Sequence, residues 1–336
     1  MKILVTAELE EAGLDTLRQY GEVIYEPLRQ TLCLLAGEML VEKLEGVSVF
    51  VTEADLVSAD VLERAPQLKV ICGCRGTVVN VDIPAATQRG ILVLFTPGRN
   101  ADAVADLTVC LMVMLARRIP EIMKLFYGRS PDDNSMMFLL QVYQMLQGAE
   151  LWEKTVGIIG LGAVGQRVAA RLRPFGAHII AYDPHALPDV FVASAARSVD
   201  LPTLLRESDL ITVHAAVSAE TEGMLGTEQF AMMKPTAYFL NLARAAITDE
   251  QALVEALREK RITGAALDVF MEEPLPADHP LLQLENVIAL PHIGGNTAEV
   301  SVHQSRILVP DIERIFRGEK PQFCLNPEVW NGFRLE

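Results

Sequence analysis

The sequence predicts an α/β protein with two domains, each built on a doubly wound parallel sheet. The chain has 336 residues, half of them apolar, which exceeds the length at which a single hydrophobic core usually stops growing. Short β-like apolar runs alternate with helical patterns along almost the whole chain. This alternation is typical of parallel sheets covered by helices. A break near Gly98 divides it into two series.

The first series predicts strands separated by helices. The expected strands lie at residues 3–6, 47–52, 68–72 and 91–94, with a less regular one near Val23. After the break, Asn100 is a good N-cap for a long apolar helix, which we expect over 101–118.

The second series runs over residues 154–290 and precedes another long helix, expected over 297–317. The tail after that helix is too short to fold alone, so it must pack on a domain. We therefore predict a discontinuous first domain, residues 1–99 and 318–336. The second domain, residues 100–317, would include both long helices.

Composition excludes several classes of partner. The formal net charge of −15 would repel a nucleic-acid backbone, and no stripe of lysine and arginine reverses it. The opening MKILVTAELEEAG has too short an apolar run for a signal peptide or a membrane span. An odd number of cysteines without CxxC pairs favours a reducing, cytoplasmic setting and no metal site. They are Cys33, Cys72, Cys74, Cys110 and Cys324.

The stretch TVGIIGLGAVGQRVAARL, residues 155–172, predicts a turn that binds a dinucleotide. An apolar strand runs into Gly160, Gly162 and Gly165 at GxGxxG spacing, and a helix with one apolar face follows. The first glycine permits a tight turn, the second lets the backbone approach a pyrophosphate, and the third lets the helix lie close to the strand. The N–H groups and the positive dipole end of the helix would then face the phosphates.

Asp183 predicts the choice between NAD and NADP. It ends the next strand, HIIAYDP, where a carboxylate can accept hydrogen bonds from the adenosine ribose. The same negative charge would repel a 2′-phosphate, and no arginine directly follows Asp183. We therefore expect NAD as the cofactor. The alternative is a glycine-rich turn with a surface aspartate that binds nothing.

Three further segments place polar side chains where later strands of this domain should end. The strand in YFLNLAR leads to Arg244, that in AALDVFMEEP leads to Asp268 and Glu273, and that in LPHIGGNT leads to His292. Ligands bind beyond the carboxyl ends of the strands in open α/β sheets. We therefore expect these four side chains to converge beside a bound nicotinamide.

Each of these residues also has a structural interpretation. Arg244 could cap a strand, Glu273 could be a solvated neighbour of Glu272, and His292 could satisfy backbone groups. However, oxidation of a secondary alcohol to a ketone needs a base that works near neutral pH, and a substrate carboxylate suits an arginine fork. A neighbouring carboxylate would also orient the imidazole. The joint placement at three successive strand ends favours catalysis.

Together these motifs resemble the D-isomer-specific 2-hydroxyacid dehydrogenase family, which includes phosphoglycerate, glyoxylate/hydroxypyruvate and D-lactate dehydrogenases. The matching segments are GLGAVG with Asp183, NLAR, DVFMEEP and PHIGGNT. The resemblance implies an NAD-dependent enzyme that transfers a hydride between nicotinamide and C2 of a D-2-hydroxyacid or 2-oxoacid. It implies a Rossmann nucleotide-binding domain and a flavodoxin-like substrate domain. Arg244 would bind the substrate carboxylate and carbonyl oxygen, His292 would be the acid/base, and Glu273 would pair with it.

The same resemblance implies the contacts of the cofactor. Asp268 would meet the nicotinamide carboxamide, and the glycines behind His292, Gly294 among them, would leave room for substrate and cofactor. Further residues expected on the cofactor side are Ala163, Val164, His214 and Ala215, with His214 as packing rather than as a base.

The loop CGCRGTVVNVD departs from the family pattern. The family commonly has a glycine-rich loop here, whose backbone N–H groups hold the substrate carboxylate, and in this chain Arg75, Gly76 and Thr77 occupy it. We hypothesise that Arg75 adds positive charge for a substrate with a second anionic group. Asn100 is a further expected substrate contact. Ala245 replaces the usual glycine after the arginine and would tighten the pocket.

Residues 119–150 predict a subunit contact. A polar turn, RSPDDNS, leads into the apolar segment MMFLLQVYQMLQ, for which core packing is the alternative. Methionine-rich faces adapt well to partner surfaces, and the family that the chain resembles dimerises through this part. We therefore expect a homodimer.

Two other functions remain to be weighed against the enzyme. NAD(H)-sensing corepressors of the same family keep the same arginine, glutamate and histidine, so a regulatory binding protein stays open, although no long disordered tail supports it. Formate oxidation fits poorly, because formate dehydrogenases pair their histidine with glutamine where this chain has Glu273.

Overall fold

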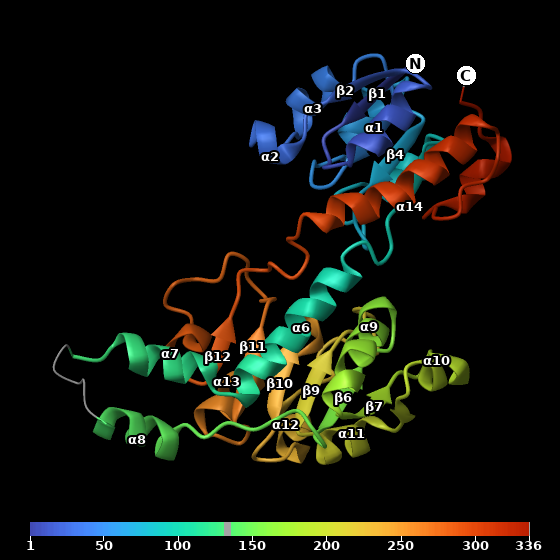
Figure 1. The fold of residues 1–336 in the computed structure, drawn as a ribbon. Helices are drawn as coiled ribbons and strands as arrows, with labels where there is room; N and C mark the ends of the chain where they lie inside the picture. Colours follow the sequence, from blue (N-terminus) through green and yellow to red (C-terminus); the bar gives the residue numbers. More distant parts are fainter. Residues whose placement is uncertain (131–135, 336) are drawn as a thin grey trace. The chain divides into compact units, whose positions relative to one another are not determined.

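The chain folds into two compact units, which are described separately. The computed structural model describes residues 1–130 and 136–335. The first unit comprises residues 1–100 and 297–336, and the second comprises residues 101–296. Each unit is an α/β body with its own parallel sheet, and its elements can be followed in Figure 1.

The first unit contains a five-stranded parallel sheet in the order β2-β1-β3-β4-β5. This is the strand order of the flavodoxin-like doubly wound fold. The strands are β1 (Lys2–Val5), β2 (Glu22–Tyr25), β3 (Val47–Thr52), β4 (Val70–Gly73) and β5 (Leu92–Phe95). The helices are α1 (Glu11–Arg18), α2 (Leu28–Thr31), α3 (Gly37–Lys43), α4 (Ala59–Glu63), α5 (Ile83–Gln88), α14 (Glu299–Phe316) and the short η4 (Pro327–Gly332). Buried apolar clusters lie on both faces of this sheet.

The second unit contains a seven-stranded parallel sheet in the order β12-β11-β10-β9-β6-β7-β8. The order reverses between β6 and β9, as in the Rossmann fold. The strands are β6 (Thr155–Ile159), β7 (His178–Tyr182), β8 (Arg197–Ser198), β9 (Leu210–Val213), β10 (Tyr238–Asn241), β11 (Gly264–Leu267) and β12 (Val287–Ala289). The helices are α6 (Ala101–Ala116), α7 (Ile119–Tyr127), α8 (Met136–Met145), α9 (Ala163–Leu172), α10 (Pro188–Ala193), α11 (Leu201–Glu207), α12 (Thr227–Met232) and α13 (Glu250–Arg258). The described residues of this unit also form the short 3-10 helices η1 (Arg173–Phe175), η2 (Ala245–Ile247) and η3 (Pro280–Gln283).

The predicted fold class is confirmed, and the predicted strands of the first unit coincide with observed ones. β3 spans the predicted residues 47–52. The largest shift at a strand start is at β4, which was predicted from Leu68 and begins at Val70. Leu68 is buried, but the register of β4 against β3 starts with the pair Val49 and Val70. Apolar residues indicate burial, whereas pairing with the neighbouring strand sets where a strand begins.

Helix α14 lies in the first unit, whereas the predicted boundary assigned residues 297–317 to the second domain. Its apolar face, which includes Leu308, belongs to a buried cluster of the first unit. Figure 1 shows α14 beside α1, and the Glu10 N–H, just before α1, donates to Ser305 Oγ at 2.9 Å. A sequence shows that a helix has an apolar face, but not which of two sheets covers it. The predicted boundary is therefore corrected to residues 296/297.

The C-terminal tail packs on the edge of the first unit's sheet. It runs antiparallel beside β5, and the Leu325 N–H donates to the Val93 carbonyl. The buried Asn326 accepts the Val93 N–H at 2.9 Å and donates to the Ile91 carbonyl at 2.8 Å. These bonds satisfy backbone groups that an edge strand would otherwise expose.

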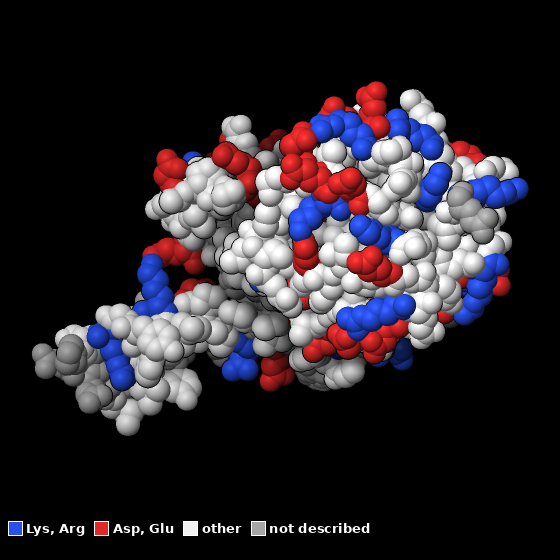
Figure 2. Space-filling view, turned by 90° about the horizontal axis from the view of Figure 1, so that it is seen from above, with Lys and Arg blue, Asp and Glu red and all other residues white. Residues whose placement is uncertain are grey.

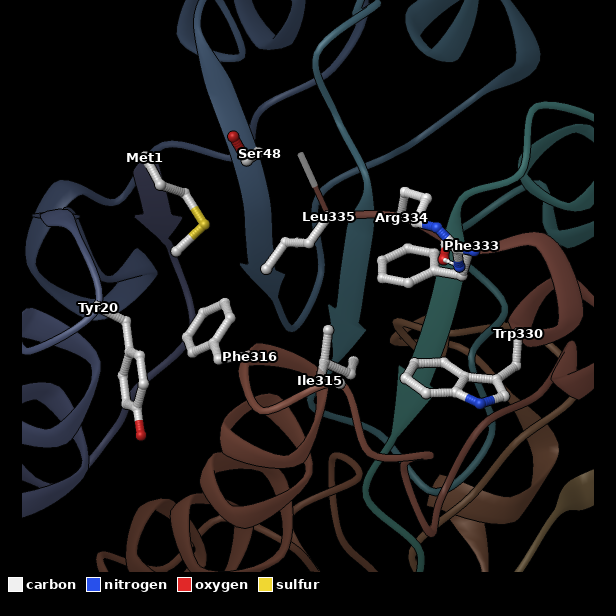
Figure 3. Close-up of a pocket in the computed structure, with 10 residues that line it drawn as sticks. Met1, Tyr20, Ser48, Ile315, Phe316, Trp330, Phe333, Arg334 and Leu335 are labelled. Atoms are coloured by element: carbon white, nitrogen blue, oxygen red, sulfur yellow. Dashed lines mark hydrogen bonds between the residues drawn. The ribbon is translucent and has the colours of Figure 1, made fainter.

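Beyond Asn326 the tail lines a hollow of about 680 Å³ in the first unit. Trp330 and Phe333 stack with their ring centroids 5.7 Å apart, and Tyr20 and Phe316 form a second aromatic pair at 4.5 Å. Figure 3 shows these side chains with Met1 and Ser48 around the hollow. Met1 and Ser48 belong to the amino ends of β1 and β3, so the hollow lies at the edge of the sheet opposite to the strands' carboxyl ends.

The region 119–150 forms helices α7 and α8, neither of which has a buried residue. The predicted turn RSPDDNS includes residues 131–135, which lie outside the described part of the chain. The helix predicted over 101–118 ends at Ala116. Arg118, two residues later, has a φ of 54°, in the left-handed region that a right-handed helix cannot include.

Charged side chains of both signs are interspersed over the face seen in Figure 2. Within residues 1–130 and 136–335, no helix is long and apolar enough to cross a bilayer. In the same ranges, no three side chains of His, Cys, Asp or Glu gather as metal ligands would.

Candidate active site

The strands of the second unit end level with one another, and the predicted site residues follow them. In the registers of β10, β11 and β12, Asn241 pairs with Leu267 and Leu267 pairs with Ala289. Three predicted residues come within three positions of these strand ends: Arg244, Asp268 and His292. The parallel topology therefore brings them to one edge of the sheet, the edge at which open α/β sheets bind ligands.

The glycine turn after β6 has three different environments for its three glycines. Gly160 has a φ of 89°, and a Cβ built on it would lie 2.5 Å from the Ala215 nitrogen. A Cβ on Gly165 would collide with the carbonyl oxygen of Gly160, whereas a Cβ on Gly162 would enter open space. The tight turn and the close helix packing therefore require Gly160 and Gly165. The space at Gly162 is left for a ligand.

Helix α9 presents its N-terminus to this turn. It begins at Ala163 with Gly162 as N-cap, and none of the described side chains caps its first turn. Ala163 is exposed and Val164 is half-buried. Uncapped N–H groups and the positive end of a helix dipole are the groups that bind phosphates. The residues present therefore fit a dinucleotide pyrophosphate.

Asp183 directly follows β7, and backbone N–H groups fix its carboxylate. Oδ2 accepts the Leu161 N–H at 2.7 Å, and Oδ1 accepts the N–H groups of His185 and Ala186 at 3.0 and 3.1 Å. The bond to Leu161 holds the carboxylate beside the glycine turn. A carboxylate accepts about four hydrogen bonds, so this one keeps capacity for a ribose hydroxyl. Its position fits the adenosine ribose of NAD.

Asn241 shapes the loop that carries Arg244. Its buried side chain donates to the Arg244 carbonyl at 3.0 Å and accepts the Ala243 N–H at 3.0 Å. The Arg244 side chain is exposed, and its Nη1 donates to the Ala243 carbonyl at 2.7 Å. Because a guanidinium has five N–H donors, the others remain available for an anion.

His292 and Glu273 form the pair that the sequence predicted. His292 Nδ1 lies 2.7 Å from Glu273 Oε2, and Glu273 Oε1 accepts the Phe270 N–H at 3.0 Å. The His292 side chain is 48% exposed, so its second ring nitrogen can reach a ligand. His292 also has a φ of 54°. Residues other than glycine are uncommon in this left-handed region and occur there often at functional sites.

Asp268 fixes the turn that follows His292. Its buried carboxylate accepts the N–H groups of Ile293 at 2.8 Å and Gly294 at 2.7 Å. Burial raises the pKa of Asp268, and these two hydrogen bonds oppose the rise. A Cβ on Gly294 would lie 2.8 Å from Asp268 Oδ2, so a glycine is needed for this close approach. Asp268 thus positions the backbone next to His292.

His214 packs beneath the glycine turn. Its backbone N–H donates to the Ile159 carbonyl at 2.7 Å, and its ring Nε2 lies 2.9 Å from Thr212 Oγ1. Burial lowers the pKa of His214 to about 3, so the imidazole is neutral at physiological pH. These contacts suit a packing role, whereas a general base would need a ring that titrates near the working pH.

The predicted substrate loop lies in the first unit, at the carboxyl end of β4. The Arg75 carbonyl accepts the Thr96 N–H at 3.0 Å, and Gly76 and Thr77 are exposed. Asn100 is half-buried and is the last residue of the first of this unit's two segments, residues 1–100. The structure therefore places Arg75, Gly76, Thr77 and Asn100 in the first unit and Arg244, Glu273 and His292 in the second.

Asn80 and Asp55 are two buried polar residues that support this loop and that were not predicted. Asn80 Nδ2 donates to the Asp55 carbonyl at 2.8 Å, and the Asp55 carboxylate accepts from Thr52 Oγ1 at 2.7 Å and from the Leu35 N–H at 2.8 Å. Within the described part of the chain, Asn80 Oδ1 and Thr96 Oγ1 are buried without a hydrogen-bond partner. The sequence NVD at residues 80–82 could have pointed to Asn80, because it places a polar residue on each side of a valine directly after the loop.

A guanidinium and an acid–base pair at one sheet edge, beside a turn fitted to a dinucleotide, suit hydride transfer to a carbonyl next to a carboxylate. The arginine matches the carboxylate, and the histidine can transfer the proton that accompanies the hydride. Fold and site together therefore define an NAD-dependent dehydrogenase class.

Comparisons with known proteins identify the family within this class. The family model for the NAD binding domain of D-isomer specific 2-hydroxyacid dehydrogenases matches residues 109–294. The chain is 36% identical to the glyoxylate reductase of Thermofilum pendens, covering all of this chain and 97% of that protein. Its structure resembles the crystal structure of the TT0316 protein from Thermus thermophilus with a TM-score of 0.80. The two sequences are 34% identical, and the match covers 97% of this chain and all of that one. The chain belongs to the D-isomer-specific 2-hydroxyacid dehydrogenase family, and NAD is its cofactor.

Another relative differs in length. The chain is 38% identical to the D-3-phosphoglycerate dehydrogenase of Methanocaldococcus jannaschii over 97% of this chain, but it spans only 59% of that protein.

The family match and the fold confirm three predictions made from the sequence: the family, the two parallel-sheet domains and the NAD dependence.

Gly162→Ala should weaken cofactor binding while leaving the fold intact, because its Cβ would enter the space open to the pyrophosphate. We expect the Kd for NADH to rise at least about tenfold, measured by fluorescence titration. Gly165→Ala should instead lower the free energy of unfolding by about 2–4 kcal/mol, because its Cβ collides with the Gly160 carbonyl. Urea unfolding of both apo variants is the control. An equal loss of stability in both would contradict the roles assigned to these glycines.

Proposed function

We propose that this chain reduces a small 2-oxoacid to the D-2-hydroxyacid with NADH and catalyses the reverse oxidation with NAD. The observation that carries the proposal is the 2.7 Å contact between His292 Nδ1 and Glu273 Oε2. This pair lies at the sheet edge that also carries Arg244, next to the dinucleotide turn. The enzyme names of the relatives support the same reaction class.

We assign substrate binding to the Arg244 guanidinium. Its exposed donors match a carboxylate in a bidentate geometry and can reach the adjacent carbonyl oxygen. Asn241 holds the backbone of this loop, so the base of the arginine side chain is fixed while its end can adapt to the substrate.

We assign proton transfer to His292. With Nδ1 directed at Glu273, Nε2 is the nitrogen that gives a proton to the carbonyl oxygen in reduction and takes one from the hydroxyl in oxidation. The contact with the carboxylate fixes the ring's orientation. NADH, when bound, supplies the hydride that the carbonyl carbon accepts.

The cofactor would be held along the same edge of the sheet. Asp183 would accept from the adenosine ribose, and Asp268 would meet the nicotinamide carboxamide. The other proposed cofactor contacts are Gly160, Gly162, Ala163, Val164, Gly165, His214, Ala215 and Gly294.

The loop after β4 and Asn100 supply the remaining proposed substrate contacts. Arg75, Gly76 and Thr77 are the contacts in this loop, and Arg75 would add a positive charge for a substrate with a second anionic group. The exposed Gly76 and Thr77 would leave the loop's backbone accessible to a small acid.

A homodimer through α7 and α8 is the proposed assembly. Neither helix has a buried residue, and together they line a hollow of about 930 Å³. Exposed fractions are 70% for Met137, 73% for Tyr143 and 75% for Tyr127. Figure 2 shows this part of the surface, at the left, as mostly uncharged. Such an apolar pair of helices gains stability by covering itself with a second copy.

The cytoplasm is the proposed location. All five cysteines are free, and burial raises the pKa of the Cys72 and Cys74 thiols, which makes them unreactive. Free buried thiols suit a reducing compartment.

A screen of NADH oxidation with glyoxylate, hydroxypyruvate and other 2-oxoacids tests the proposed function. We expect turnover with at least one, a loss of about 10² to 10⁴ in kcat for His292→Ala, and a smaller loss with an altered pH profile for Glu273→Gln. NADH binding by both variants is the control. NADH binding without turnover of any 2-oxoacid would favour the regulatory alternative.

Arg75→Ala tests the second anionic group. We expect kcat/KM for dianionic 2-oxoacids to fall about tenfold or more relative to monoanionic ones, because a guanidinium–carboxylate contact is lost. Steady-state kinetics with matched pairs of acids measure the ratio. If the ratio stays the same, the role of Arg75 is wrong.

Replacement of Met137 and Tyr143 by glutamate tests the dimer. Two charges on each copy should raise the dimer dissociation constant at least about a hundredfold, because they would be desolvated at the contact. Sedimentation equilibrium measures the mass, and Val192→Glu, at another exposed apolar site, is the control. A monomeric wild type at micromolar concentration would contradict the proposal.

A further inference from the structure

We infer that Glu220, held by His185, is a second determinant that makes the cofactor site select NAD over NADP. His185 follows Asp183 by two residues, and Glu220 lies in the loop between β9 and α12. The inference concerns the cofactor alone, so it does not depend on which 2-oxoacid the enzyme reduces.

The contact between these residues joins two loops across the carboxyl end of β6. β7 and β9 lie on either side of β6, and their last residues, Tyr182 and Val213, are both level with Ile159. His185 Nε2 lies 3.1 Å from Glu220 Oε2. The bridge therefore spans the place where the glycine turn begins and where Asp183 is fixed.

The charge of Asp183 is partly offset by its surroundings. The N–H groups of Leu161, His185 and Ala186 all donate to this carboxylate. Each places a partial positive charge beside it, which stabilises the anion and also weakens the repulsion that it exerts on a nearby phosphate. A second negative charge therefore strengthens the repulsion of a dianionic 2′-phosphate, and the Glu220 carboxylate supplies this charge.

Both loops contain acids and neither contains lysine or arginine. Residues 183–187 read DPHAL, and residues 214–222 read HAAVSAETE. Sites for NADP accommodate the 2′-phosphate with an arginine, and these loops offer none. The side chains of His185 and Glu220 are 77% and 69% exposed, so their contact adds little to stability. The contact matters because it sets the position of the Glu220 carboxylate.

Glu220→Gln tests the inference because it keeps the shape and the hydrogen-bonding capacity of the side chain while removing its charge. Isothermal titration calorimetry at pH 8 would compare ADP-ribose with 2′-phospho-ADP-ribose. We expect the 2′-phosphorylated ligand to gain about three- to tenfold in affinity relative to ADP-ribose, with the Kd for ADP-ribose almost unchanged. The ratio of kcat/KM for NADPH to NADH should rise by a similar factor.

Glu222→Gln is the matched control, since Glu222 is exposed in the same loop without a described contact to His185. It should change the affinity ratio less than about twofold. His185→Ala should raise the ratio as Glu220→Gln does, and the double variant should add nothing further, because both changes act through one carboxylate.

Two results would overturn the inference. One is an unchanged affinity ratio in Glu220→Gln, and the other is an equal change in Glu222→Gln, which would indicate only a general loss of negative charge. Thermal unfolding checks that each variant is folded, and Glu220→Ala provides a second neutral variant for the same comparison.

Discussion

The buried carboxylate of Asp268 determines the geometry of the sheet edge that carries His292 and Arg244. It joins the end of β11 to the turn after β12 by accepting the N–H groups of Ile293 and Gly294. His292 stands directly before that turn, in the left-handed backbone region, with its ring against Glu273. The position of the His292 backbone is therefore set by a buried contact to the residues that follow it. A histidine alone at a strand end would have no such constraint.

The same edge of the sheet provides positive charge for anionic ligands in a chain that is negative overall. The chain carries a net charge of −15, yet its cofactor and its proposed substrate are anions. Positive potential is supplied locally, by the N-terminus of α9 and by the exposed Arg244 guanidinium, which lie beyond ends of strands in one sheet. Of the carboxylates at this edge, Asp183 accepts backbone N–H groups and Glu273 contacts the His292 imidazole. A few fixed charges thus outweigh the overall charge at short range, where screening is weak.

Local patterns allowed much of the fold and the site to be predicted. The alternation of strands and helices predicted both parallel sheets. The glycine spacing predicted the tight turn at Gly160 and the close helix packing at Gly165, which agree with the surroundings of these two residues. The pairing of His292 with Glu273, which the family resemblance implied, is present in the structure at 2.7 Å. The glycine roles were readable because each depends on a residue type at a fixed distance from a strand end.

Other features depend on packing between segments without a shared pattern. The sequence alone determined two doubly wound sheets and a dinucleotide turn, since periodicity and strand-end spacing are local. Only the tertiary structure decided that α14 packs on the first sheet, that Asn80 is tied to Asp55 and that His185 meets Glu220. Each of these contacts depends on how distant segments come together, because an apolar face or a polar side chain does not specify its partner.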